Sequence, residues 1–288
     1  MGKVIILTDS TSDVPEKVRK QLGIEMVPLK IEIDGVGYLD NVTLDPGTFY
    51  EKLKASKELP RTSQPSPAEF MEAYQRILQR EPGASIIAFT LSSQFSGTYQ
   101  SALIAGSMLE EQADITVIDS KSASYGFGVR VVRAAEMAQA GASKEEILEE
   151  AKRLEENTEL YFLVDTLEYL QKGGRIGRAS AMIGTLLNIK PILTIDRDGF
   201  VNSADKIRGT KKAMNRILDM LGETFTPEEP VAVIMAWTSD GEETAKNLHE
   251  LLQGRFNVRK TDDTFIGPVI GNYVGSGTAA VFMYRLKG

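Results

Sequence analysis

The stretch Val4-Ile5-Ile6-Leu7-Thr8, followed at once by Asp9-Ser10-Thr11-Ser12, decides the fold class of this 288-residue chain. A short apolar run bounded by small polar residues is typical of a buried strand. Similar runs recur at Ser85–Leu91 and Ile115–Asp119, and helical patterns separate them. This alternation predicts βα units and a largely parallel sheet.

The rest of the pattern predicts two domains. In the first half we expect an extended run at Glu25–Ile33, helices at Pro46–Ser56, Pro67–Arg80, Gly97–Glu110, Phe127–Ala140 and Lys144–Glu156, and a closing strand at Leu160–Val164. In the second half we expect helices at Leu167–Lys172, Ala179–Leu187 and Glu242–Leu252, a hairpin of Lys190–Ile195 with Val201–Lys206, a strand at Val231–Trp237, and extended segments at Val269–Tyr273 and Ala279–Arg285. The fold class is therefore α/β, with a parallel-sheet domain over residues 1–165 packed against a smaller α+β domain over residues 166–288. A cleft between two such domains is a natural ligand site.

Composition excludes several classes of function. The formal net charge of −7 argues against a nucleic-acid binder, which needs a basic face. The absence of cysteine excludes disulfides and thiol catalysis, and no apolar run is long enough for a transmembrane helix. The N-terminal apolar run is too short for a signal peptide, so we expect a cytoplasmic protein. The single histidine, His249, is expected on a helix surface, which argues against a His-dependent hydrolase and a His-rich metal site.

Small hydroxyl and acidic residues follow each expected strand of the first half. They are Asp9-Ser10-Thr11-Ser12, the run from Ser92 to Thr98, Asp119-Ser120-Lys121-Ser122 and Asp165-Thr166. Because ligands of open parallel sheets bind at the carboxyl ends of the strands, this edge is a candidate site. Helix capping alone could also produce the pattern. Asp9, Asp119 and Asp165 could hold a magnesium ion, but capping or hydrogen-bonding roles are favoured, and we expect no metal.

The step Ser96-Gly97-Thr98 is the strongest single candidate. A serine and a glycine at a helix start expose free backbone N–H groups at the positive end of the helix dipole, which suits an anion. No basic residue lies between Ala84 and Leu109, so a carboxylate fits better than a phosphate. The alternative is that Ser96 is a plain N-cap. A second candidate is the loop Arg61-Thr62-Ser63-Gln64-Pro65-Ser66-Pro67, which two prolines stiffen and whose hydroxyls could form a clamp.

Five motifs in order give the chain a family resemblance. They are Leu7-Thr8-Asp9-Ser10-Thr11, Thr62-Ser63-Gln64-Pro65, Leu91-Ser92-Ser93-x-x-Ser96-Gly97-Thr98, Leu170-Gln171-Lys172-Gly173-Gly174-Arg175-Ile176 and Lys190-Pro191-Ile192-Leu193. Together they resemble the DegV family over essentially the whole chain. The resemblance implies a non-enzymatic protein that buries one long-chain fatty acid, such as palmitate, stearate or oleate, between two domains and uses no other cofactor.

The resemblance also implies roles for individual residues. Thr62 and either Ser96 or Ser93 would bind the fatty-acid carboxylate, with Ser63, Gly97 and Tyr273 as head-group neighbours. The expected partner is the ATP-binding subunit of a fatty acid kinase, for which the chain would serve as acyl carrier. Arg175 and Arg208 would contact phosphate or the kinase, and Lys211 and Lys212 would extend the basic face. Transient membrane contact is compatible with this role.

Two further expectations follow from the resemblance. Where some family members carry a histidine near the head group, this chain has Tyr273 or Asn272, and either side chain can hydrogen-bond a carboxyl group. The apolar residues Ala181, Met182, Ile183, Leu186, Leu187 and Ile189 would suit a lipid tunnel, although ordinary core packing explains them equally well. The alternative function is a serine-dependent acyl hydrolase or transferase with Ser96 or Ser93 as nucleophile, for which a histidine base is missing.

Overall fold

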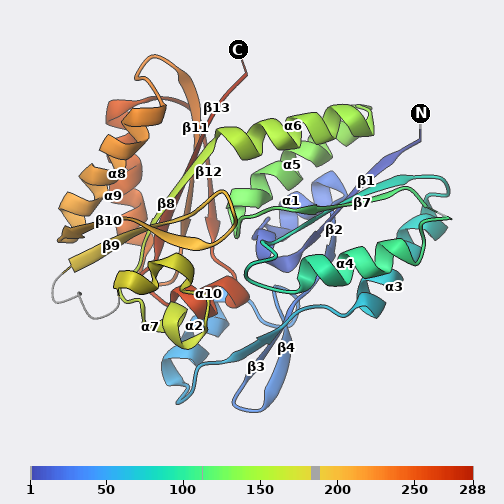
Figure 1. The fold of residues 1–288 in the computed structure, drawn as a ribbon, viewed down its shortest axis with the longest axis horizontal. Coiled ribbons are helices and arrows are strands. Elements are labelled where there is room, and N and C mark those ends of the chain that lie inside the picture. The colour runs from blue at the N-terminus through green and yellow to red at the C-terminus, as the bar shows by residue number, and fades with distance from the viewer. Residues whose placement is uncertain (1, 112, 183–188, 288) are drawn as a thin grey trace. The chain divides into compact units, whose positions relative to one another are not determined.

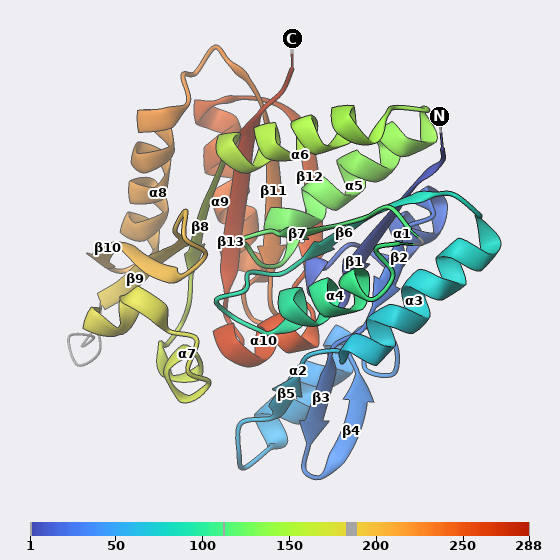
Figure 2. The ribbon, with the colours of Figure 1, turned by 45° about the vertical axis from the view of Figure 1, so that its right-hand side comes forward.

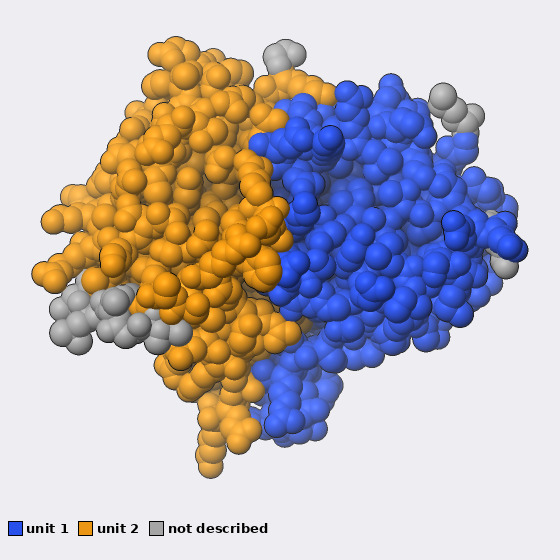
Figure 3. All heavy atoms as spheres, viewed as in Figure 1, with its two compact units in different colours: residues 1–45, 60–156 blue, residues 46–59, 157–288 orange. Residues whose placement is uncertain are grey.

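The computed structural model describes residues 2–111, 113–182 and 189–287. Its contacts divide the chain into two compact units, which Figure 3 shows in different colours. Unit 1 comprises residues 1–45 and 60–156, and unit 2 comprises residues 46–59 and 157–288. The predicted domains are residues 1–165 and 166–288. The two units differ from them because segment 46–59 belongs to unit 2 and because the main division follows residue 156 rather than residue 165. The extent of domains that fold independently remains a prediction.

Unit 1 is built on the parallel sheet that the sequence predicts. Its strand order is β2-β1-β6-β7, and all neighbouring pairs run parallel. The strands are β1 (Val4–Asp9), β2 (Glu25–Val27), β6 (Ser85–Thr90) and β7 (Ile115–Asp119). Every residue of β1 is buried, as expected of a strand covered on both faces. The α/β class of this part of the chain is confirmed.

Helices cover both faces of this sheet (Figures 1 and 2). They are α1 (Glu16–Leu22), α3 (Pro67–Arg80), α4 (Thr98–Ser107), α5 (Tyr125–Gln139) and α6 (Lys144–Asn157). α3 and α4 pack side by side, and their apolar side chains form one core with Ile5 and Leu7 of β1. α5 packs against β1 and α1. A capping box opens α6: the Ser143 N–H donates to Glu146 Oε2 (2.8 Å), and the Glu146 N–H donates to Ser143 Oγ (3.2 Å).

A second, three-stranded sheet in unit 1 carries the Thr62 loop. Its order is β4-β3-β5, with β3 (Lys30–Ile33), β4 (Val36–Leu39) and β5 (Arg61–Ser63). A tight turn at Asp34-Gly35 joins β3 and β4, and both turn residues have positive φ (49° and 79°). β5 pairs antiparallel with β3, and Thr62 lies opposite Ile31. The start of the loop Arg61–Pro67 is therefore a strand of this sheet.

Unit 2 contains a six-stranded mixed sheet in the order β10-β9-β8-β13-β11-β12. Its strands are β8 (Thr158–Leu163), β9 (Ile189–Ile195), β10 (Val201–Arg208), β11 (Pro230–Trp237), β12 (Asn257–Phe265) and β13 (Ala279–Arg285). β11 and β12 run parallel, and the other neighbouring pairs run antiparallel. The strand expected at Leu160–Val164 is present as β8, but it belongs to this sheet and not to the first half of the chain, because it pairs with β13 and β9.

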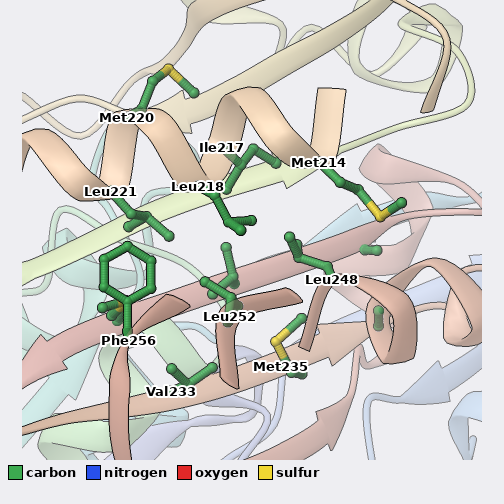
Figure 4. Packing of buried hydrophobic residues seen from close by; sticks show 14 of the residues in the cluster. Met214, Ile217, Leu218, Met220, Leu221, Val233, Met235, Leu248, Leu252 and Phe256 are labelled. Carbon is green, nitrogen blue, oxygen red and sulfur yellow. The ribbon is translucent and has the colours of Figure 1, made fainter. Parts of the chain in front are cut away.

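The helices of unit 2 are α2 (Pro46–Ala55), α7 (Glu168–Lys172), α8 (Thr210–Thr224), α9 (Glu242–Arg255) and α10 (Pro268–Val274), with a 3₁₀ helix, η2, at Gly177–Met182. Figure 4 shows how α8 and α9 pack on the sheet. Ile217, Leu218 and Leu221 of α8 pack in one core with Leu248 and Leu252 of α9. This core fixes α8, and with it the basic residues at its start.

One expectation about unit 2 is wrong at Val269–Tyr273, which forms helix α10 rather than a strand. Pro268 is the first helical residue and Gly267 the N-cap. Gly271 packs so closely against α2 that an added Cβ would lie 2.8 Å from Tyr50 Cζ. The Tyr50 hydroxyl also donates to the Ile266 carbonyl (3.0 Å). Contacts distant in sequence thus override the extended preference of these β-branched and aromatic residues.

The predicted apolar helix Ala179–Leu187 falls partly outside the described residues. Its start lies in η2, which ends at Met182. Ile183, Leu186 and Leu187 lie outside the described residues, and Ile189 begins β9. Across the part of the chain that the structure describes, no helix combines the length and apolar character that a membrane span requires.

Candidate functional site

The carboxyl ends of β1, β6 and β7 meet at one edge of the unit 1 sheet. Thr8 lies opposite Phe89, and Thr90 opposite Asp119. The segments that follow these three strands are therefore neighbours, as their order in a parallel sheet predicts. Asp165-Thr166 is not part of this edge, because β8 belongs to the other sheet. Three of the four polar segments expected at the edge are thus brought together.

Asp9 is the most deeply buried acid of this edge. Its Oδ1 accepts hydrogen bonds from the Thr11 N–H (2.8 Å) and the Thr11 hydroxyl (2.5 Å), and its Oδ2 accepts one from the Leu91 N–H (2.8 Å). Burial raises the pKa of Asp9 to about 6, although these hydrogen bonds act in the opposite direction. Asp9 caps the 3₁₀ helix η1 (Ser10–Ser12) and links it to β6. These contacts favour a hydrogen-bonding role for Asp9 over a metal-binding one.

The Ser92-Ser93 turn is attached to the loop after β7 by its backbone. The Ser92 N–H donates to the Ser122 carbonyl (2.9 Å), and the Ser93 N–H donates to Asp119 Oδ1 (3.1 Å). Ser92 is buried and its hydroxyl accepts from the Gln94 N–H (3.2 Å), whereas Ser93 is exposed. Of these two serines, Ser93 therefore has the more accessible side chain.

Ser96 does not act as the N-cap of α4. The helix begins at Thr98, its N-cap is Gly97, and no side chain of the cap residue closes its first turn. Ser96 precedes the cap, and its hydroxyl lies 2.9 Å from the Thr98 hydroxyl. The alternative interpretation of Ser96 as a plain N-cap is therefore wrong. The first turn of α4 carries no acidic residue, which leaves its positive dipole end without a carboxylate of its own.

The Thr62 loop lies directly against this helix start. Gln64 Oε1 accepts a hydrogen bond from the Gly97 N–H (3.2 Å). A Cβ atom at Gly97 would lie 2.8 Å from Gln64 Oε1, so glycine permits this close approach. Pro67 opens α3 and Ser66 forms a capping box with Glu69, which fixes the far end of the loop. The structure thus places the half-buried Thr62 and the exposed Ser63 on the loop that contacts the Ser96-Gly97-Thr98 step.

In unit 2 the structure brings together Arg175 and Tyr273. The Arg175 guanidinium carbon lies 5.0 Å from the centre of the Tyr273 ring, and Nη1 donates to the Gly173 carbonyl (2.8 Å). A Cβ atom at Gly173 would lie 2.6 Å from Tyr273 Cε1, so this glycine leaves room for the ring. Asn272, the other candidate for the head-group position, is fully buried in α10.

The basic residues Arg208, Lys211 and Lys212 gather at the start of α8. Arg208 is the last residue of β10, and the two lysines lie in the first turn of the helix. All three are exposed. They form a local positive surface on a chain whose formal net charge is −7.

The acid and histidine candidates have local partners. Asp165 Oδ1 accepts from Lys190 Nζ (2.7 Å), and Asp119 Oδ1 also accepts from the Lys121 N–H (3.0 Å). His249 lies on α9, where its Nε2 is 3.3 Å from the Thr261 hydroxyl. Within residues 2–111, 113–182 and 189–287, no cluster of three or more acidic or histidine side chains suits a metal ion.

The sequence interpretation missed Arg130, a buried residue of α5. Its Nη2 donates to the Ser120 carbonyl (2.6 Å) at the end of β7, and its Nη1 donates to Glu155 (3.0 Å). A lone arginine between Val129 and Val131, in an otherwise apolar part of the helix, was the signal that could have revealed it.

Comparison with known proteins places this two-unit α/β protein in a family. The family model described as "Uncharacterised protein, DegV family" matches residues 3–286. A DegV domain-containing protein of Caldanaerobacter subterraneus is 40% identical over 284 residues, which cover 98% of this chain and 99% of the relative. The chain therefore belongs to the DegV family, as its five motifs suggested.

Solved structures share the fold over the whole chain. A DegV family protein from Thermus thermophilus, described as binding fatty acid, matches with a TM-score of 0.91 and 35% identity over 99% of this chain and 100% of its own. A protein from Eubacterium ventriosum, described as binding stearic acid, matches with a TM-score of 0.85 and 26% identity over 99% of this chain and 98% of its own. These matches confirm the predicted fold class of an α/β protein with an N-terminal parallel sheet and a separate mixed sheet. The expectation that the second domain is the smaller one is wrong, because unit 2 is about as large as unit 1.

Proposed function

We propose that this protein binds one long-chain fatty acid without transforming it, and that Thr62 and Ser96, with Ser93 beside them, hold its carboxylate. The observation that supports this most directly is the contact between the Gln64 side chain and the Gly97 N–H (3.2 Å). It joins the two hydroxyl-bearing segments, which are 33 residues apart in sequence. The fatty acids bound by the similar proteins support the same ligand class.

Neutral donors suit this ligand. Hydroxyl and N–H groups orient a carboxylate through hydrogen bonds, while the alkyl chain supplies most of the affinity. Each buried methylene contributes about 0.8 kcal/mol, so about 14 methylenes contribute roughly 11 kcal/mol before the costs of ordering. Ser63, Gly97 and Tyr273 are assigned as head-group neighbours in this proposal. The proposal includes a cytoplasmic location.

The test is lipid extraction and mass spectrometry of the protein purified from cells, followed by binding measurements on variants. Free fatty acid together with unmodified protein supports binding, whereas an acyl adduct on a serine contradicts it. Thr62→Ala and Ser96→Ala should each weaken palmitate binding by up to about tenfold, the effect of one lost hydrogen bond. Ser107→Ala is the control, because Ser107 is an exposed serine at the opposite end of α4 whose hydroxyl donates to the Ile104 carbonyl (2.9 Å). Unchanged affinity in both site variants would contradict the assignment.

The proposal extends to a partner: a separate ATP-binding kinase subunit phosphorylates the presented carboxyl group. The half-buried Arg175 and the exposed Arg208, Lys211 and Lys212 support this step, because positive charge suits phosphate and an acidic docking surface. Acyl phosphate, trapped with hydroxylamine, should form only when protein, kinase subunit, ATP and fatty acid are combined. Arg208→Glu should lower its yield without changing fatty-acid affinity. Equal yield from this variant would remove Arg208 from the interface.

A further inference from the structure

Arg130 is a buried cation outside the segments assigned to the ligand. It is only 3% exposed, on the inner face of α5. Its two terminal nitrogens donate to the Ser120 carbonyl (2.6 Å) and to Glu155 Oε2 (3.0 Å), and its buried Nε has no hydrogen-bond partner in the described structure. Burial lowers the pKa of Arg130, but an arginine keeps its charge in proteins. A buried charge is unfavourable unless it is paired. The backbone carbonyl of Ser120 is one of the groups that pair with this guanidinium.

That backbone is the loop of residues 119–124 between β7 and α5. Two of its non-glycine residues, Lys121 and Ser124, have positive φ values of 50° and 53°. Such conformations are disfavoured for L-residues and persist where surrounding contacts impose them. The Ser120 N–H donates to the Thr90 carbonyl (3.0 Å), and the Ser124 hydroxyl donates to Asp13 Oδ2 (2.5 Å). Arg130 adds a charged hydrogen bond to the Ser120 carbonyl between these two anchors.

The same loop holds the Ser92-Ser93 turn. Asp119 Oδ1 accepts from the Ser93 N–H (3.1 Å), and the Ser122 carbonyl accepts from the Ser92 N–H (2.9 Å). The Ser120 hydroxyl donates to that Ser122 carbonyl (3.2 Å) and accepts from the Ser122 N–H (3.1 Å). An unbroken series of contacts therefore runs from the guanidinium through the loop to the turn that carries Ser93, one of the proposed carboxylate-binding residues.

We propose that Arg130 is a positioning residue for the head-group site: it fixes loop 119–124, and the loop fixes the backbone of Ser92 and Ser93. This inference rests on the proposed function. Removal of Arg130 should allow the turn to move and should weaken the hydrogen bonds to a carboxylate. The alkyl chain is held by burial of apolar surface, which does not depend on the orientation of this turn.

The test compares two ligands with the same chain, palmitate and hexadecanol, in wild type and in variants. Arg130→Met should weaken palmitate binding about tenfold while hexadecanol affinity stays within about twofold. Arg130→Lys, which retains the charge, should recover part of the loss. The ratio of palmitate affinity to hexadecanol affinity depends on the head group alone, because the two ligands have the same alkyl chain. A general loss of stability would weaken both ligands equally and leave this ratio unchanged.

Arg153→Met is the matched control, because Arg153 makes a two-point ion pair with Glu150 (2.9 and 3.0 Å) within α6. It should leave the ratio unchanged. If Arg130→Met does not fold, Arg130→Lys tests the role of Arg130, and Asp119→Ala, which removes the acceptor of the Ser93 N–H, tests the contact between the loop and the turn. If folded Arg130 variants have the same affinity ratio as wild type, Arg130 is not a positioning residue, and the proposed function is unaffected. A wild-type protein that binds no palmitate would instead overturn the proposed function.

Discussion

The two polar regions assigned to the ligand and its partner are organised differently. At the sheet edge of unit 1, hydroxyls, backbone N–H groups and the buried Asp9 form a hydrogen-bonded network. In unit 2, a single guanidinium, that of Arg175, lies over the ring of Tyr273. In unit 1, many weak hydrogen bonds together hold the hydrogen-bond donors in place. In unit 2, one aromatic ring, that of Tyr273, holds one positive charge, that of Arg175. The first arrangement suits orientation of a carboxylate, and the second suits a cation that meets a phosphate.

The largest effect expected from this contrast is the pH dependence of stability at Asp9. Its folded-state pKa of about 6 lies above the ordinary aspartate value of 3.8. The folded state therefore binds a proton more tightly than the unfolded state, and the free energy of unfolding falls as pH rises between these values. The total change is about 2 to 3 kcal/mol between pH 4 and pH 7.

Urea unfolding of wild type and Asp9→Asn across this pH range measures the effect. The difference in stability, wild type minus variant, should decrease as pH rises. Asp114→Asn, measured at pH values extended below 3.8, is the control of opposite sign, since the hydrogen bond from Lys144 lowers the pKa of Asp114. That carboxylate stabilises the protein above pH 3.8 and loses its contribution as pH falls through its folded pKa. Parallel curves for wild type and Asp9→Asn would show that Asp9 is not the buried, weakened acid described above.

A smaller effect is expected at the contact between the two segments of the unit 1 site. Gly97→Ala adds a methyl group 2.8 Å from Gln64 Oε1 and displaces that exposed side chain. Palmitate affinity should fall two- to tenfold, about 0.4 to 1.4 kcal/mol, because the Thr62 loop loses its contact with the helix start. Stability should change little, since the end of a flexible side chain can move.

Gly106→Ala is the matched control for this change. Gly106 lies in the same helix, and its added Cβ would make an ordinary contact of 3.6 Å with Ile115. This variant should retain full affinity, with stability equal to wild type or up to about 1 kcal/mol higher through helix propensity. Isothermal titration calorimetry and thermal unfolding distinguish the two variants. Equal affinities would show that the contact between Gln64 and Gly97 does not matter for the ligand.

The fold of the site was predictable where local signals are sufficient. The parallel order of β1, β6 and β7 follows from alternating strand and helix patterns, and Pro67 marks the start of α3. Local signals do not predict which sheet β8 joins. That depends on its pairing with β13, a strand more than a hundred residues later in the sequence. Strand β12, with charges at Arg259, Lys260, Asp262 and Asp263, lacks the apolar alternation of a buried strand because it is an edge strand with an exposed face.

For the proposed site, the sequence predicts residue types but not contacts. Hydroxyls at strand ends favour this edge as a candidate site, and the motifs propose Thr62 and Ser96 as its residues. That Gln64 reaches Gly97, and that Arg130 holds the loop beside Ser93, depends on the packing of helices and loops. No local pattern encodes those distances.

The smallest effect concerns the stacked pair of unit 2, and a double-mutant cycle measures it. Arg175→Met and Tyr273→Leu each remove several contacts, so their separate effects on stability do not isolate the pair. Their coupling energy should be about 0.5 to 1 kcal/mol, as expected for a half-exposed cation over an aromatic ring. The control cycle combines Arg175→Met with Phe225→Leu, whose ring stacks with Arg285 instead (4.9 Å), and should give a coupling near zero. If the first cycle also gives no coupling, the ring of Tyr273 does not hold Arg175, and the contrast between a network and a stacked cation does not hold.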